Sequence, residues 1–384
     1  MIITVAAKLE ATDRQRACLI ETIKSFNAAA TFAAETGLTH GVFTQASIHK
    51  VCYKEIRKQF GLPAQLAVRA IGKAVAFFSR HRKMPRFKSL SATYDCRVMR
   101  ITGKGIMSLS TNCGRESVKF SIGEHQQAVL DSAIKLGQCS VKRVGDDLFA
   151  YIQVHIDAAE ARDHGSNVIG VDMGVVNIAA DSNGNTYSSE EIEKKRKWCA
   201  SRRRTLQLVG TRSAKRRIRS TGKAESNHRR TVNHQISRRI VDAAKGTNSA
   251  IAIEKLKGIG KGKRFRKSQR ARMNGWSFYQ LAQFIEYKAE MAGIAVIKVD
   301  PRNTSRICSS CGNCDKKSRK NRDEYCCICC GHTENADINA AKNIRNRANV
   351  GWPMVHGCES ACRTNVMHNA SHAYNFTNIS GSAS

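Results

Sequence analysis

The chain has 384 residues, which excludes a single small domain, because domains usually run to about 100–200 residues each. Apolar residues make up 41% of it, which favours folded structure over disorder. Charge is the unusual property: 64 Lys and Arg against 31 Asp and Glu give +33, far more than solubility requires. Such a field attracts polyanions, so we expect a nucleic-acid partner; a ribosomal type of basic protein and a membrane-surface binder are the alternatives.

Membrane insertion and secretion are not expected from this sequence. An apolar run of about 18 residues, long enough to cross a bilayer, is missing, and the first residues lack the layout of a signal peptide. We therefore expect a cytoplasmic protein with no membrane partner. Almost half of the 15 cysteines fall within residues 308–330. In the cytoplasm, such clustering favours metal binding over disulfides.

The first 160 residues contain two kinds of pattern. After a short strand at 2–6, apolar residues recur at helical spacing between 11 and 92. From about residue 93 to 157 the pattern changes to short strands separated by turns that contain glycine. We expect helices in the first segment and a small β-barrel or sandwich in the second.

A second sheet is predicted from residue 167 onward. Residues 167–187 have the pattern of a buried strand, a turn and a second strand. Further apolar strands end at Glu254 and Asp300, and helices are expected near 277–292 and 335–347.

A strongly basic stretch lies between these strands. Residues 194–239 are dense in Lys and Arg and contain a single acidic residue, Glu225. A packed core does not tolerate so much like charge, so we expect two helices that face solvent or phosphate groups. A loop rich in Gly, Lys and Arg follows at 255–272. The predicted nucleic-acid contacts in these two segments are Arg202, Arg203, Arg204, Lys215, Arg216, Arg217, Lys263, Arg264 and Arg266.

Three acidic residues occupy positions that are expected to be buried, where a charged carboxylate is energetically unfavourable. Asp172 and Glu254 each close an apolar strand, and Asp337 shares a helical face with Ala340 and Ile344. A buried carboxylate is unfavourable unless it is paired or binds a metal. Oxygen ligands on rigid strand ends suit two Mg²⁺ or Mn²⁺ ions, the arrangement that hydrolyses phosphodiesters. We predict a catalytic metal site at these three acids, although each acid taken singly could be a turn former.

The cysteine-rich segment has the spacing of a zinc site. Cys308 and Cys311 form one Cys-x-x-Cys pair, and a second pair follows about 15 residues later, which is typical of four-thiolate zinc. The second pair could be Cys326 with Cys329 or Cys327 with Cys330. A glycine directly after a pair lets the backbone turn tightly around the metal-bound sulfur. Gly312 and Gly331 follow Cys311 and Cys330, which favours Cys327 and Cys330; a redox-active pair is the alternative.

Several longer motifs carry a family resemblance. They are IGVDMGVVNIA around Asp172, NHQISRRIV at Asn233–Val241, AIEKLKG around Glu254, GWSFYQLAQFIEYKAEMAGIAVIKVDPRNTSRICSSCG leading into the cysteine segment, and NADINAAKNI around Asp337. Together they resemble the TnpB family, transposon-encoded RNA-guided DNA nucleases related to type V CRISPR effectors. The resemblance implies that the three acids take the family's catalytic positions and that Cys308, Cys311, Cys327 and Cys330 take its zinc positions.

The resemblance also implies a domain organisation. It implies an α/β RNase H-like (RuvC) nuclease domain at 165–306 and 332–350, with a zinc ribbon inserted at 307–331. It implies a wedge-like N-terminal β-barrel at 1–10 and 93–160, interrupted by a helical recognition domain at 11–92. Residues 351–384 match no part of the family and are expected to form a disordered tail.

The activity implied by the resemblance is RNA-guided cleavage of DNA by two-metal-ion hydrolysis. The implied cofactors are Mg²⁺ (or Mn²⁺) and Zn²⁺. The implied partners are a guide RNA and a double-stranded target DNA with a short adjacent motif, while the oligomeric state is left open. Guide-directed DNA binding without cleavage, strand transfer by a DNA transposase with the same fold, and general binding of RNA by a basic protein are the alternatives.

Overall fold

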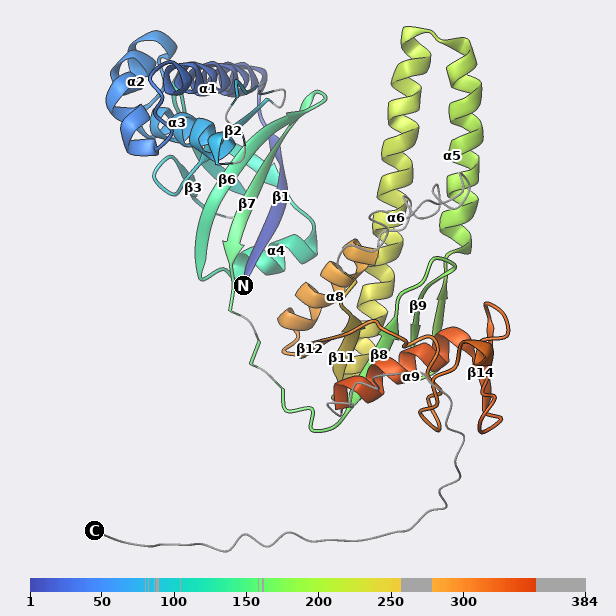
Figure 1. Ribbon diagram of the computed structural model, residues 1–384. Coiled ribbons are helices and arrows are strands. Elements are labelled where there is room, and N and C mark those ends of the chain that lie inside the picture. The colour runs from blue at the N-terminus through green and yellow to red at the C-terminus, as the bar shows by residue number, and fades with distance from the viewer. Residues whose placement is uncertain are drawn as a thin grey trace, which may run out of the picture. The chain divides into compact units, whose positions relative to one another are not determined.

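Figure 1 shows the computed structural model of the chain, which describes residues 1–256 and 278–349 apart from positions 80, 82, 86, 88, 89, 104, 158 and 161. Lys263, Arg264 and Arg266 and the expected tail at 351–384 lie outside the described residues. The chain divides into two compact units, Met1–Ala158 and Ala159–Ser384. None of the helices within the described ranges has both the length and the apolar content needed to cross a membrane.

The first unit is built on an antiparallel sheet of seven strands in the order β2-β6-β7-β1-β5-β4-β3. The strands are β1 (Ile2–Glu10), β2 (Ser91–Tyr94), β3 (Met99–Ile101), β4 (Ile106–Thr111), β5 (Gly114–Ser121), β6 (Lys135–Val144) and β7 (Asp147–His155). Alternate residues Val5, Ala7 and Leu9 of β1 are buried, as expected for a strand with one covered face. The order places β2 and β3 at the two edges, and closure of the sheet into a barrel stays a prediction.

Four helices belong to the first unit: α1 (Asp13–Thr39), α2 (Gln45–Phe60), α3 (Ala64–Phe78) and α4 (Glu124–Asp131). Helix α1 begins at a capping box in which Thr12 and Gln15 exchange side-chain to backbone hydrogen bonds. Helices α1, α2 and α3 pack against one another, and α1 and α3 also contact β2. The helical spacing between residues 11 and 92 therefore corresponds to these three helices, whereas α4 lies within the segment 93–157, where short strands were expected.

The second unit is built on a mixed sheet of five strands in the order β10-β9-β8-β11-β12. The strands are β8 (Val168–Asp172), β9 (Asn177–Asp181), β10 (Thr186–Ser188), β11 (Ala250–Glu254) and β12 (Val296–Val299). β8, β11 and β12 run parallel to one another, and β9 and β10 are added as antiparallel hairpins. Asp172 and Glu254 are the last residues of β8 and β11, as their apolar runs predict.

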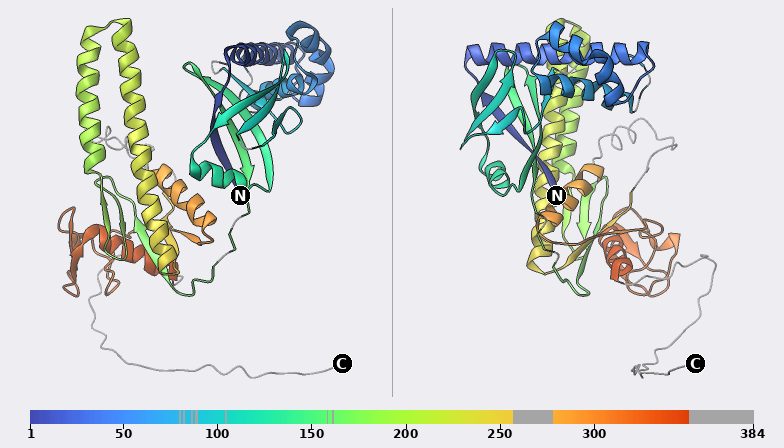
Figure 2. Two further views of the ribbon diagram at one scale, coloured as in Figure 1. Left: turned by 180° about the vertical axis from the view of Figure 1, so that it is seen from behind. Right: turned by 90° about the vertical axis from the view of Figure 1, so that its left-hand side faces the viewer.

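Helices cover both faces of this second sheet (Figure 2). Odd-numbered strand residues such as Ile169 and Ile251 pack against helices α6 (Arg212–Gly246) and α8 (Phe278–Met291). Even-numbered ones such as Val168 and Ala252 pack with Ile344 of the opposite helix, α9 (Ala336–Asn349). Because side chains of a strand alternate between the two faces, Asp172 and Glu254 belong to the face that α9 covers.

A glycine allows α9 to approach β8 closely. A Cβ atom at Gly170 would collide with backbone atoms of Ala341 and Arg345 in α9. A side chain at this position would therefore push the helix away from the sheet. The close packing brings the first turn of α9, which contains Asp337, toward the end of β8.

The predicted basic segment forms a helical hairpin. Helix α5 (Glu190–Val209) packs along α6, and the pair projects beyond the sheet of its own unit in the views of Figures 1 and 2. An ion pair of 2.8 Å between Arg203 of α5 and Glu225 of α6 links the two helices. Cys199 is the buried residue of α5, so most of this helix faces solvent. The two helices expected within 194–239 are thus observed, and α6 continues to Gly246.

Candidate active site and metal centre

The three predicted acids line one cleft of the second unit. The cleft has a volume of about 340 Å³, and Asp172, Glu254 and Asp337 all contribute to its wall. Val171 pairs with Ile253 in the parallel register, so Asp172 and Glu254 are the next residues along two adjacent strands. Asp337 reaches the cleft from the first turn of α9. The structure therefore brings together three residues that are far apart in the sequence.

Burial makes the charged form of two of these acids unfavourable. Loss of hydration on burial, reinforced by the negative charges of Glu254 and Asp337, raises the pKa of Asp172 to about 7, although Arg319 opposes the shift. Burial also raises the pKa of Glu254, against a hydrogen bond from Thr304. A divalent cation would relieve this repulsion, and carboxylates are its preferred ligands. The donor set therefore fits Mg²⁺ or Mn²⁺.

Three further side chains contact the acids, and none of the contacts was evident from the sequence. The Thr304 hydroxyl donates to Glu254 Oε1 at 2.6 Å, and the Asn177 amide donates to Asp337 Oδ2 at 2.9 Å. The guanidinium of Arg319 lies 3.6 Å from the Asp337 carboxylate. No spacing rule in the sequence relates Arg319 to Asp337. Only the packing of the ribbon against the rest of the second unit creates this pair.

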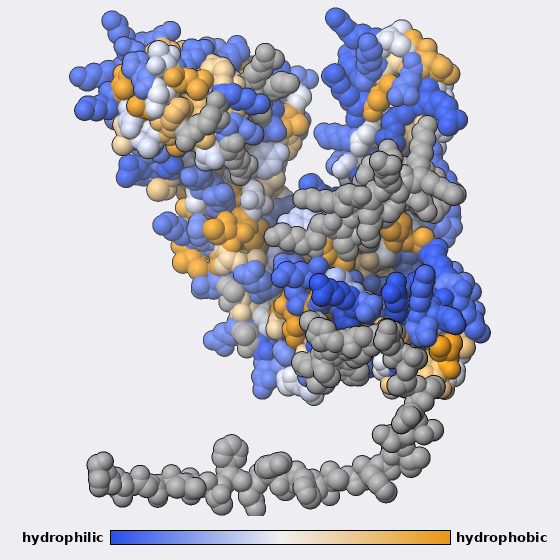
Figure 3. All heavy atoms as spheres, in the orientation of Figure 1, coloured by the Kyte–Doolittle hydropathy of each residue, from blue (hydrophilic) through white to orange (hydrophobic). Residues whose placement is uncertain are grey.

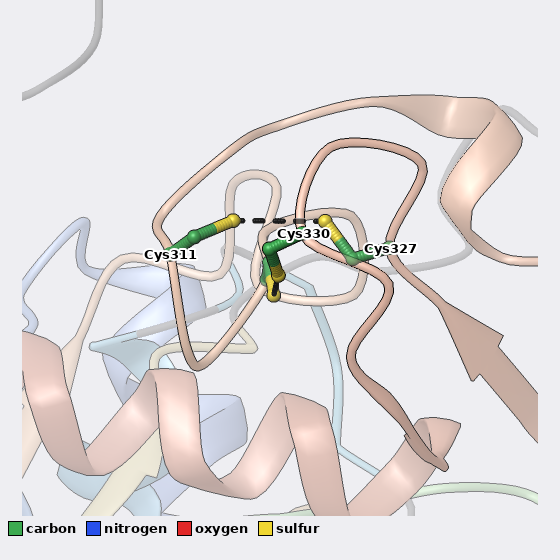
Figure 4. Close-up of side chains that lie close together, drawn as sticks. Cys311, Cys327 and Cys330 are labelled. Atoms are coloured by element: carbon green, nitrogen blue, oxygen red, sulfur yellow. Dashed lines mark hydrogen bonds between the residues drawn. The ribbon is translucent and has the colours of Figure 1, made fainter. Parts of the chain in front are cut away.

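Four cysteine sulfurs form a compact cluster. The Sγ atoms of Cys308, Cys311, Cys327 and Cys330 all lie within 4.8 Å of one another. Figure 4 shows the Cys311 and Cys327 sulfurs pointing at each other, 3.6 Å apart, and the Cys308 and Cys330 sulfurs are separated by 3.7 Å. Zinc–sulfur bonds of about 2.3 Å in a tetrahedron place sulfurs about 3.8 Å apart, so the cluster fits zinc. Within the described residues, this cluster does not include Cys314, Cys326 or Cys329.

The two cysteine pairs share one backbone turn. Gly312 has φ 75° and donates its N–H to the carbonyl oxygen of Cys308 at 2.9 Å. Gly331 has φ 72° and donates to the carbonyl oxygen of Cys327 at 3.0 Å. Positive φ is the conformation that glycine adopts without strain. The glycines that favoured Cys327 and Cys330 in the sequence thus make equivalent turns in the two knuckles.

The cysteine ribbon is joined to the helix that carries Asp337. Besides the single turn η1 (Lys316–Ser318), the ribbon contains the paired strands β13 (Glu324–Cys326) and β14 (Thr333–Asn335), and β14 leads directly into α9. Asn339 and Asn343 of α9 donate to the carbonyl oxygen of Ile307 at 2.8 and 2.6 Å. Disturbing the ribbon is therefore expected to disturb the position of Asp337.

The predicted nucleic-acid contacts lie on the helical hairpin, with one distinction among them. Arg203 is half-buried in its ion pair with Glu225, and so it stabilises the hairpin itself. The other predicted contacts that the structure describes have exposed side chains; they are Arg202, Arg204, Lys215, Arg216 and Arg217.

Comparison with known proteins places these features in a family context. The family model "Cas12f1-like, TNB domain" matches residues 278–344, and the model "Probable transposase" matches residues 151–261. A CRISPR-associated endodeoxyribonuclease Cas12f1 of Sulfoacidibacillus thermotolerans is 38% identical over 197 residues, 47% of this chain and 45% of that protein. A TnpB-like protein of Methanocaldococcus jannaschii is 39% identical over 80 residues, 21% of this chain and 29% of that protein. Less than half of the length of either relative is matched.

The fold is also similar to a solved structure. The cryo-EM structure of a Cas12f1-sgRNA-target DNA complex contains a chain that matches 88% of this chain and 84% of its own length. The TM-score is 0.60 at 16% sequence identity, so this likeness concerns the fold alone. The matched family models and the named relatives confirm the resemblance of this chain to the TnpB family and the related type V CRISPR effectors.

Proposed function

We propose that this chain is an RNA-guided DNA endonuclease that hydrolyses its target at a RuvC-like, RNase H-fold active site. The observation that carries the proposal is the convergence of Asp172, Glu254 and Asp337 on one cleft from two strand ends and a helix. The names of the relatives support it, since they include a CRISPR-associated endodeoxyribonuclease and a TnpB-like protein.

The three carboxylates would hold two Mg²⁺ or Mn²⁺ ions, which activate the attacking water and stabilise the leaving oxygen when bound. Thr304 and Asn177 orient Glu254 and Asp337 through the hydrogen bonds described above. Arg319 directs a positive charge into the same cleft, where a phosphodiester would carry negative charge. Cys308, Cys311, Cys327 and Cys330 would hold a structural Zn²⁺ that shapes the ribbon.

The substrates in this proposal are a guide RNA and a double-stranded target DNA that has a short adjacent motif. Pairing between RNA and DNA would supply sequence specificity, whereas protein contacts would recognise backbone and shape. The net charge of +33 and the exposed cations of the α5–α6 hairpin support binding of two polyanions.

The decisive test compares the wild-type chain, purified with the RNA that accompanies it, with Asp172→Asn, Glu254→Gln and Asp337→Asn. Each variant should lose Mg²⁺-dependent cleavage of a DNA matching that RNA. DNA binding should stay within a few-fold, because affinity comes mostly from Lys and Arg at phosphates. Cleavage retained by any one variant would remove that residue from the site.

Strand transfer is the second candidate, because the family model that matches residues 151–261 is described as a probable transposase. RNase H-like carboxylates can serve either reaction, so the acids do not separate them. Denaturing gels of the same reactions do: hydrolysis gives shortened strands, whereas strand transfer joins a donor end to the target.

A further inference from the structure

A large aromatic side chain is exposed on the basic hairpin. Trp198 of α5 is 50% exposed. Lys195 Nζ lies over its ring, 4.7 Å from the centroid, and the Arg202 guanidinium carbon lies 5.3 Å from it. The residues occupy positions i−3, i and i+4, which are neighbours on one side of a helix. The ring is therefore the centre of a small cationic surface, made of Lys195, Trp198 and Arg202.

The ring lies on a different side of α5 from the buried contact with α6. The adjacent residue, Cys199, is buried and directs its sulfur toward the carbonyl oxygen of Thr221 in α6, at 4.0 Å. One residue corresponds to about 100° around a helix, so Trp198 points away from this contact. Figure 3 shows that hydrophilic side chains cover much of this hairpin on the visible face, beside smaller hydrophobic areas.

Three of the acids near this surface are paired with other cations. Glu190 pairs with Lys194 at 2.7 Å, and Glu193 pairs with Arg196 at 2.8 Å. Glu225 pairs with Arg203. In contrast, Lys195 and Arg202 are placed over an uncharged ring. Cation–π contacts at exposed positions are weak, so these two charges can turn toward phosphates at little cost.

We propose that Trp198 is a stacking platform for an unpaired nucleobase, with Lys195 and Arg202 neutralising the phosphates on either side of that base. The proposal rests on the proposed function and adds to it a contact with single-stranded nucleic acid, either RNA or displaced DNA. Every base has a π face, so an aromatic ring between two cations binds a strand without reading its sequence. An apolar protein surface would not match this site, because the surroundings of the ring are cationic.

The test follows the fluorescence of Trp198 in the full chain. The sequence has three tryptophans, so Trp276→Phe and Trp352→Phe leave Trp198 as the one indole. Oligouridylate and oligothymidylate are titrated without added Mg²⁺ or Mn²⁺, which prevents cleavage and leaves the zinc of the cysteine cluster in place. We expect saturable quenching by at least one of them, and the tighter one identifies the strand. A strand of the same length with abasic sites has the same charge and should bind with little quenching.

Affinity measured by anisotropy gives the second readout. Trp198→Ala should weaken binding on the order of tenfold, and Trp198→Phe should restore most of it. The loss should be equal at low and high salt because stacking releases no counterion, whereas Arg202→Gln should flatten the salt dependence. Tyr279→Ala on α8, which removes an aromatic side chain that is 68% exposed, should change nothing.

Two results would overturn the proposal. One is anisotropy that reports binding while Trp198 fluorescence stays constant; the other is unchanged affinity in Trp198→Ala. Binding of neither strand by the wild-type chain would overturn the proposed function as well. Loss of cleavage in the carboxylate variants alongside unchanged affinity in Trp198→Ala would leave the nuclease standing and remove only the stacking site.

Discussion

The guanidinium of Arg319 lies 3.6 Å from the carboxylate of Asp337. Arg319 belongs to the cysteine ribbon, between η1 and β13, whereas Asp337 lies in the first turn of α9. Arg319 also donates to the backbone oxygen of Arg322 at 3.0 Å, which fixes it within the ribbon. The ribbon therefore supplies a side chain to the candidate active site in addition to its cluster of thiols.

Replacing Arg319 tests this role. Arg319→Ala should slow single-turnover DNA cleavage by roughly 10²-fold, the effect of removing one preorganised charge from a reacting centre. Arg319→Lys should recover only part of the rate, because a lysine keeps the charge but not the planar group. Zinc content should not change. Arg306→Ala, at an exposed position in the loop leading into the ribbon, is the matched control; an equal loss in that variant would assign the effect to ribbon stability instead.

The zinc prediction separates two neighbouring cysteines. Cys327→Ser should release the metal, because it removes one of four clustered thiolates, whereas Cys326→Ser should retain about one zinc per chain. Metal analysis of the purified variants measures this directly. The reverse pattern, with zinc lost from Cys326→Ser and kept by Cys327→Ser, would show that the other register binds the metal.

The hairpin prediction concerns affinity rather than chemistry. Charge reversal of the exposed residues Arg204, Arg216 and Arg217 should weaken binding of the copurifying RNA and flatten its salt dependence. Each phosphate contact releases a counterion when the complex forms, so a variant with fewer contacts releases fewer counterions. Arg203 is left in place because its reversal would also break the ion pair with Glu225.

The control for that experiment is an equal reversal of charge in the ribbon, at Lys316, Lys317 and Lys320. RNA affinity is measured against salt concentration for the wild type and both triple variants. Equal changes in the two variants would mean that net charge alone matters. An unchanged slope for the hairpin variant would exclude these three residues from the binding surface.

A half-buried lysine in the first unit gives a prediction about the pH dependence of stability. Lys73 of α3 donates to Asn27 Oδ1 of α1 at 2.5 Å and to the Ser91 carbonyl oxygen of β2 at 3.2 Å. Burial lowers its pKa from 10.5 to about 8. Between these two values the unfolded chain binds more protons than the folded chain, so this residue makes the free energy of unfolding rise with pH. Below about pH 8 the lysine is charged in both states, and the full cost of burying its charge lowers the free energy of unfolding.

Lys73→Met should remove that rise. Denaturant unfolding at a series of pH values from about 8 to 10 should give a smaller increase in stability for Lys73→Met than for the wild type. Lys24→Met, which removes an exposed lysine of α1, serves as the control and should follow the wild type. Parallel pH curves for Lys73→Met and wild type would show that Lys73 ionises alike in both states.

The sequence alone was sufficient for features that depend on short segments. Alternating and continuous apolar runs predicted where β8 and β11 end, and so which positions Asp172 and Glu254 occupy. The glycine after each Cys-x-x-Cys pair favoured Cys327 and Cys330, the residues that the structure brings together. Strand periodicity and a turn of positive φ are set by residues only a few positions apart, so they are visible without the fold.

Strand β6 shows where the local pattern is insufficient. Its residues, KLGQCSVKRV, mix basic side chains with a glycine, and a register irregularity between Leu136 and Cys139 breaks the alternation. The strand is stabilised by pairing with β2 and β7 on either side. β7 follows β6 directly in the chain, whereas β2 comes from a segment much earlier in the sequence, so the local pattern of β6 does not show both of its neighbours.

Only the tertiary structure decided which side chains surround the acids. The Asn177 amide contacts Asp337 across 160 residues of sequence, and Thr304 contacts Glu254 across 50. A glycine is required at position 170 because α9 packs against it. Arg203 differs from Arg202 and Arg204 because it forms an ion pair with Glu225 of the next helix. Local preferences act over a few residues, whereas these contacts form only when helices and strands from distant segments pack together.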